Sequence, residues 1–86
     1  MLIGQLLFAQ ERTISGTVND DAGLPLPGVN IIIEGTTTGT QSDFDGNYSI
    51  RANEGQTLVF SYVGFETQSV RVGTSNTVNV IMAAGT

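Results

Sequence analysis

The stretch of this 86-residue chain that most resembles a chemical site is SDFDGNYSI, at residues 42–50. Asp43, Asp45 and Asn47 occupy alternate positions, as ligands do at the start of an EF-hand calcium loop. A twelve-residue loop started at Asp43 also fits at its later positions, with Ile50 eighth and Glu54 last. The sixth position is Tyr48, where that loop needs glycine for its sharp turn. The sequence therefore argues against an EF-hand.

Two interpretations of this stretch remain open. One is a looser calcium site made by the carboxylates of Asp43 and Asp45 and a backbone carbonyl. The other is a tight turn, in which Gly46 has a positive φ and one of the aspartates braces the backbone. We carry the turn forward as the prediction, with Tyr48 and Ile50 of the next strand pointing into the core. Accordingly, no residue is assigned as a catalytic, cofactor-binding or metal-binding residue.

The residue types needed for most enzymatic chemistry are missing from the sequence. The chain has no histidine, cysteine or lysine, which removes the commonest general base, thiol nucleophiles and Schiff-base chemistry. Two close carboxylate pairs exist, Asp20 with Asp21 and Asp43 with Asp45, and both lie in turn-rich sequence. Aspartate is favoured there because its side chain accepts hydrogen bonds from nearby backbone N–H groups. We predict that the protein is not an enzyme and holds no cofactor.

The charge of the chain restricts its partners. The net charge is −5, and the only cations are Arg12, Arg51 and Arg71, which are far apart in sequence. Binding to nucleic acid or to an anionic membrane surface depends on clustered lysine and arginine. We therefore expect neither a nucleic-acid partner nor direct insertion of this domain into a membrane.

Two kinds of binding surface are compatible with the sequence. Aromatic rings could form a carbohydrate platform, and the candidates are Phe44, Tyr48, Phe60, Tyr62 and Phe65. Most of these lie in apolar alternation and are expected in the core, whereas Phe44 is either partly exposed or folded back as a lid. The polar segment 35–42 is an expected edge strand that a partner could extend by β-augmentation, or a protected edge without a partner.

The apolar residues recur with a period of two, which predicts strands and no helix. The expected strands cover residues 13–19, 29–35, 36–42, 47–52, 56–63, 65–72 and 77–83. The most apolar run, 56–63, should be a central strand covered on both faces. Together these runs predict an all-β fold, an antiparallel β-sandwich of about seven strands.

The first ten residues differ from the rest of the chain. Residues 1–10 are apolar and uncharged, and they are shorter than the ~20 residues that a membrane-spanning helix needs. They resemble the end of a signal peptide with a cleavage point after Ala9, although no basic residue precedes them and Leu7 is large for its position. The alternatives are an N-terminal strand or a disordered tail. We expect the domain itself to occupy residues 11–86.

Four segments, in this order, resemble a known family. They are SGTV (15–18), PLPGVNI (25–31), GTTTGTQSDFDGNY (35–48) and LVFSYVGFETQ (58–68). The chain resembles, over about residues 12–83, the carboxypeptidase-regulatory-like domain. It is most similar to the form found at the mature N-terminus of SusC/RagA-type TonB-dependent outer-membrane transporters.

The resemblance implies a prealbumin (transthyretin)-like Greek-key sandwich and a non-catalytic role. In the transporters this domain precedes the plug and barrel, on the periplasmic side of the outer membrane. The implied partners are the rest of the transporter chain, which imports glycans or peptides, and periplasmic components of the TonB system. These 86 residues contain no plug or barrel, so we expect a fragment, an isolated domain or a short relative. The alternatives are a calcium- or carbohydrate-binding module, or an accessory domain of a secreted peptidase or adhesin.

Overall fold

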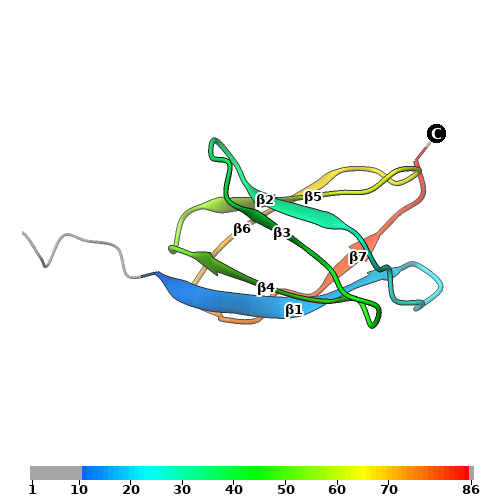
Figure 1. Cartoon of the computed structure of the whole chain (residues 1–86), viewed down its shortest axis with the longest axis horizontal. Coiled ribbons are helices and arrows are strands. Elements are labelled where there is room, and N and C mark those ends of the chain that lie inside the picture. Colours follow the sequence, from blue (N-terminus) through cyan, green and yellow to red (C-terminus); the bar gives the residue numbers. More distant parts are fainter. Residues whose placement is uncertain (1–10, 86) are drawn as a thin grey trace, which may run out of the picture.

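The computed structural model describes residues 11–85, which form a two-layer β-sandwich (Figure 1). The seven strands are β1 (Arg12–Asp20), β2 (Asn30–Ile33), β3 (Gly39–Gln41), β4 (Asn47–Ala52), β5 (Thr57–Ser61), β6 (Gln68–Arg71) and β7 (Val80–Met82). One sheet has the order β4-β1-β7 and the other β3-β2-β5-β6. The predicted all-β sandwich of about seven strands is confirmed. The predictions for residues 1–10 lie outside the described residues.

One pair of strands departs from the predicted antiparallel arrangement. β1 and β7 are parallel, with Val18 opposite Val80 and Asp20 opposite Met82, whereas the other four pairs are antiparallel. The prediction is wrong for this pair because a period-two pattern identifies a strand but not the direction of its neighbour. A parallel pair needs a long connection, and here the chain passes through the second sheet between β1 and β7.

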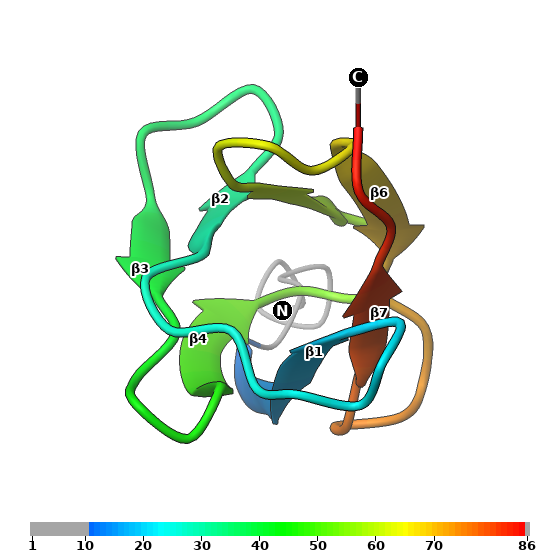
Figure 2. The ribbon, with the colours of Figure 1, turned by 90° about the vertical axis from the view of Figure 1, so that its right-hand side faces the viewer.

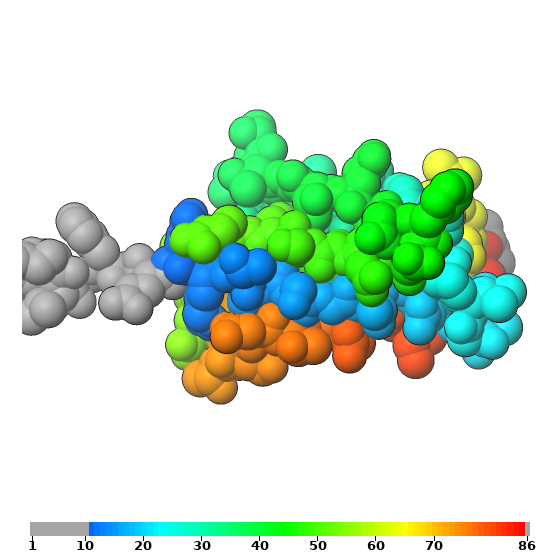
Figure 3. Space-filling view, turned by 60° about the horizontal axis from the view of Figure 1, so that its bottom comes forward, coloured from blue at the N-terminus to red at the C-terminus, as the bar shows by residue number. Residues whose placement is uncertain are grey.

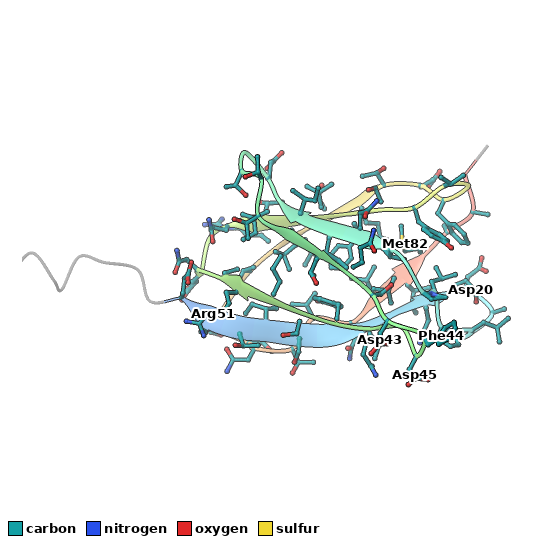
Figure 4. All side chains as sticks on the ribbon, in the orientation of Figure 1. Asp20, Asp43, Phe44, Asp45, Arg51 and Met82 are labelled. Atoms are coloured by element: carbon teal, nitrogen blue, oxygen red, sulfur yellow. The ribbon has the colours of Figure 1, made fainter. Side chains whose placement is uncertain are left out.

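Alternation along the strands builds the core between the two sheets. In β4 the side chains of Tyr48, Ile50 and Ala52 are buried while their neighbours are exposed, which confirms the predicted inward direction of Tyr48 and Ile50. In β2, Ile31 and Ile33 face inward in the same way. Burying one such large side chain contributes about 1.5–3 kcal/mol, so this single apolar layer is the main stabilising feature (Figure 4).

The second sheet corrects one prediction and confirms another. β5 lies between β2 and β6, so it is central as predicted. Its outward residues, Thr57, Val59 and Ser61, are only half-buried, so the prediction of cover on both faces is wrong. Within residues 11–85 no further layer packs over that face (Figure 2). β3 is an edge strand as predicted, although it is limited to three residues.

The connections divide between the two ends of the sandwich. The connections β1–β2, β3–β4 and β5–β6 lie at one end, together with residues 83–85 (Figures 1 and 2). The start of β1 and the connections β2–β3 and β4–β5 lie at the opposite end. Among residues 11–85 there is no helix of the length and hydropathy that crossing a membrane requires. The turn of the SDFDGNYSI stretch, at residues 42–46, lies at the first of these ends, and β4 leads away from it toward the other end.

Candidate functional site

A shallow, open groove runs between the edges of β3 and β4, at the corner where the two sheets separate. Its volume is about 290 Å³. The lining residues are Thr40, Gln41, Asp43, Asn47, Tyr48 and Ser49. Several of these groups already have partners within the protein: for example, Gln41 Nε2 donates a hydrogen bond to Asn30 Oδ1 at 2.9 Å. The groove therefore presents a polar surface without a pair of groups arranged for proton transfer.

Asp43 holds the turn that forms one end of this groove. Its Oδ1 accepts hydrogen bonds from the backbone N–H groups of Asp45 and Asn47, both at 2.9 Å. The backbone N–H of Asp43 donates to Asn47 O at 2.8 Å, and that of Gly46 donates to Asp43 O at 2.9 Å. Gly46 has a φ of 79°. The predicted turn is confirmed, and Asp43 is the aspartate that braces it.

This geometry does not bring together a set of ligands for a calcium ion at the turn. Asp43 Oδ1 is occupied by two N–H donors, and Asp45 is exposed at the tip of the turn. Over residues 11–85 no three histidine, cysteine, aspartate or glutamate side chains are grouped as metal ligands. A looser site that uses two carboxylates and a carbonyl stays a hypothesis. The prediction that the chain has no catalytic, cofactor-binding or metal-binding residue likewise stays a prediction.

Gly46 fixes the turn against the rest of the protein. Gly46 is buried, and its carbonyl oxygen accepts a hydrogen bond from Val18 N at 2.8 Å. A Cβ atom at this position would lie 2.7 Å from Val18 O and 3.1 Å from Pro25 Cβ. The turn is therefore docked on the end of β1 and on the β1–β2 connection, with no room for a side chain.

Tyr48 links the site to both sheets. Its ring meets Phe60 edge-to-face, with centroids 5.4 Å apart and an interplanar angle of 82°, and its hydroxyl donates a hydrogen bond to Val78 O at 2.6 Å. Burial raises the pKa of Tyr48 to about 12. The Tyr48 hydroxyl keeps its proton at neutral pH, and its hydrogen bond ties β4 to the segment before β7.

The aromatic residues do not form one surface. Tyr48 and Phe60 are in the core as expected, and Tyr62 and Phe65 are half-buried, with ring centroids 5.8 Å apart. Phe44 is 88% exposed, so it does not fold back as a lid on the sandwich. The structure does not assemble the five rings into a carbohydrate platform.

Comparison with known proteins decides the family. The family model described as "CarboxypepD_reg-like domain" matches residues 14–85. The chain belongs to this family. The predicted resemblance is confirmed.

Relatives of this CarboxypepD_reg-like domain are much longer proteins. The chain is 46% identical over 84 residues to "TonB-dependent receptor P3" of Formosa agariphila, covering 95% of this chain and 8% of the receptor. It is 43% identical over 75 residues to "TonB-dependent receptor SusC" of Bacteroides thetaiotaomicron, covering 87% of this chain and 7% of that receptor. The chain thus spans less than a tenth of the length of these relatives.

Solved structures share the fold at lower identity. Two matches are chains in crystal structures of mutant type II cohesin–X-dockerin complexes from Acetivibrio cellulolyticus, with TM-scores of 0.68 and 0.69. Each is 23% identical and covers 85% of this chain and 58% of the other. This likeness concerns the fold alone.

Sequence reasoning described one feature of this CarboxypepD_reg-like domain only in outline, as turn-rich sequence around Asp20 and Asp21, and it missed another. The first is a second turn, in which Asp20 Oδ1 accepts hydrogen bonds from Ala22 N and Leu24 N, both at 2.9 Å. Its signal was available, since DDAGL and DFDGN share aspartate and a glycine three residues later. The second is buried Ser42, whose Oγ donates to Leu26 O at 2.6 Å and accepts from Val29 N at 2.9 Å. Nothing in its residue type distinguishes Ser42 from the other serines.

Proposed function

We propose that this chain is a non-catalytic accessory domain of a TonB-dependent outer-membrane receptor that takes up glycans or peptides. One observation carries the proposal: four receptors named TonB-dependent are 43–49% identical to this chain over 85–95% of its length. The domain would lie in the cell envelope, on the periplasmic side of the outer membrane. Its partners would be the rest of the receptor chain and periplasmic components of the TonB system.

The use of the polar groups supports a role without catalysis. The carboxylates of Asp20 and Asp43 hold backbone turns, and the Tyr48 hydroxyl ties β4 to the segment before β7. These are the groups that enzymatic chemistry would need free. A domain built in this way acts through its surface and through its connection to the receptor.

The proposal can be tested in a full-length relative. Residues 11–85 of this chain would replace the matching segment of TonB-dependent receptor P3, and a second variant would delete that segment. We expect the chimera to support TonB-dependent uptake at the level of the parent receptor, and the deletion variant to lose it. Uptake that is unchanged by the deletion, with equal receptor abundance in the outer membrane, would refute an accessory role in transport.

The orientation needs its own measurement. The chain has no cysteine, so Thr37→Cys in the exposed β2–β3 connection provides a single labelling site within the domain. In a chimera whose other cysteines are removed, a membrane-impermeant maleimide should react only after the outer membrane is permeabilised. Labelling of intact cells would place the domain on the outer surface and contradict the proposal.

A further inference from the structure

One end of the sandwich carries three of the five exposed large hydrophobic side chains of residues 11–85. We define the loop face as the connections 20–29, 42–46 and 62–67 together with residues 83–85. Each connection contributes one large exposed side chain: Leu24 is 62% exposed, Phe44 is 88% exposed and Val63 is 92% exposed. The other exposed large hydrophobic residues of the described chain, Ile32 and Ile81, lie on strands. Three such side chains at one end, on neighbouring connections rather than scattered over the whole surface, favour an interaction site at this end.

The segments of the loop face are in contact with one another. A Cβ on Gly46 would lie 3.1 Å from Pro25 Cβ, so the β3–β4 turn contacts the β1–β2 connection. A Cβ on Gly28 would lie 3.7 Å from the Tyr62 ring, so the β1–β2 connection also contacts the β5–β6 connection. The backbone N–H of Gly85 donates to Gly64 O at 2.9 Å. Figure 3 shows the β3–β4 turn in green beside the β1–β2 connection in cyan at this end.

The charges of the chain are divided between its two ends. The loop face carries the five carboxylates Asp20, Asp21, Asp43, Asp45 and Glu66 and no cation. The opposite end carries all three arginines, Arg12, Arg51 and Arg71, balanced by Glu11, Glu34 and Glu54. Figure 4 shows this division, with the labelled aspartates at one end and Arg51 at the other. The whole net charge of −5 is therefore on the loop face.

The acidic groups of the loop face are available to a partner. Asp21, Asp45 and Glu66 are exposed. Among the described residues there is one ion pair, between Arg51 Nε and Glu11 Oε1, 3.7 Å apart. It lies at the opposite end and uses no carboxylate of the loop face. Exposed carboxylates around apolar side chains complement a surface with the inverse arrangement, since charge steers the encounter and apolar contact supplies affinity.

We infer that the loop face docks onto a protein surface in which basic side chains surround an apolar one. Nucleic acid and anionic lipid headgroups are disfavoured here because five carboxylates would repel their phosphates. The inference rests on the proposed function, because an accessory domain of a receptor meets other protein surfaces of that assembly. Beyond the proposed function, the inference specifies which part of the domain makes the contact and which chemistry the partner surface has.

The test is an NMR titration of the ¹⁵N-labelled 86-residue chain with three short synthetic peptides. The first alternates lysine and leucine, the second has serine in place of each leucine, and the third has glutamate in place of each lysine. We expect the first peptide to shift the amides of Leu24, Phe44 and Val63, and to bind at least about tenfold more tightly than the other two. Salt should weaken its binding because the charges are exposed.

Matched variants locate the contact. Phe44→Ser removes an exposed apolar side chain of the loop face, and Ile81→Ser removes one from β7, so only the first should weaken binding. Likewise Asp45→Asn should weaken binding more than Glu34→Gln at the opposite end. Shifts spread over both ends, equal binding of the peptide without leucine, or no shifts at millimolar peptide would each overturn the inference. None of these results bears on the uptake assay, so the accessory role would stand.

Discussion

Two turns of this domain have the same hydrogen bonds and different surroundings. In the turn Asp20–Leu24 and in the turn Asp43–Asn47, the aspartate Oδ1 accepts two backbone N–H groups at 2.9 Å. In both, a glycine three residues after the aspartate has a positive φ, 86° at Gly23 and 79° at Gly46. The spacing Asp-x-x-Gly therefore accompanies the same local structure at both positions.

The surroundings separate the two turns. A Cβ on Gly23 would meet no atom within 4 Å, whereas a Cβ on Gly46 would lie 2.7 Å from Val18 O. Both turns lie beside the end of β1, because Val18 N donates to Gly46 O and Val18 O accepts from Leu26 N. The first turn projects into solvent, and the second is packed on the strand. The comparison teaches that equal local geometry does not imply equal tolerance of substitution.

The strongest test of this difference replaces each glycine by alanine. Gly23→Ala should lower the free energy of unfolding by about 1 kcal/mol, the cost of a positive φ with a side chain. Gly46→Ala should lower it by about 3 kcal/mol, because the methyl group also displaces backbone atoms of β1. Urea unfolding with an unchanged m-value measures both. Equal losses would mean that packing on Val18 has no energetic effect.

A second test concerns Tyr48, which anchors the strand that follows the Asp43 turn. Tyr48→Phe should cost about 1 kcal/mol, because Val78 O loses its hydrogen bond. The pKa of Tyr48 is raised from 10.0 to about 12, so folding favours the protonated hydroxyl. The stability from this shift is complete below pH 10 and is lost between pH 10 and 12, at up to about 1.4 kcal/mol per pH unit.

The free energy of unfolding, measured between pH 9 and 12, tests whether stability falls with rising pH as expected. Tyr48→Phe should flatten the decline of stability with rising pH, whereas the control Tyr62→Phe should leave the Tyr48 contribution in place. A decline that is as steep in Tyr48→Phe as in the unmodified chain would contradict the assignment to this hydroxyl.

The smallest effects test what the two turns share. Asp20→Ala and Asp43→Ala should each cost about 1 kcal/mol, since each removes an acceptor of two backbone hydrogen bonds. Asp20→Asn and Asp43→Asn keep an oxygen at the same place and should cost less than about 0.5 kcal/mol. Thermal or urea unfolding of the four variants provides the comparison. An asparagine variant as unstable as its alanine counterpart would show that charge, rather than the acceptor, holds the turn.

Most of the local structure could be predicted from residue types. Alternation in NYSIRA correctly predicted burial of Tyr48 and Ile50, and the glycine in DFDGN correctly predicted a positive φ at Gly46. The cover of β5 was predicted wrongly, because an apolar run shows that side chains avoid water but not that a second layer exists to receive them. For Phe44, the sequence left exposure and a lid as alternatives, since a turn residue has no periodicity to give its direction.

The sequence by itself determined the strands, the two Asp-x-x-Gly turns and the family, because these depend on residues close together in the chain or on their order. Tertiary structure alone decided that β7 lies parallel to β1, that Gly46 packs on Val18 and that five carboxylates and three exposed apolar side chains share the loop face. The physical reason is that each of these features joins residues distant in sequence. Their proximity follows from how the two sheets pack, which no local pattern encodes.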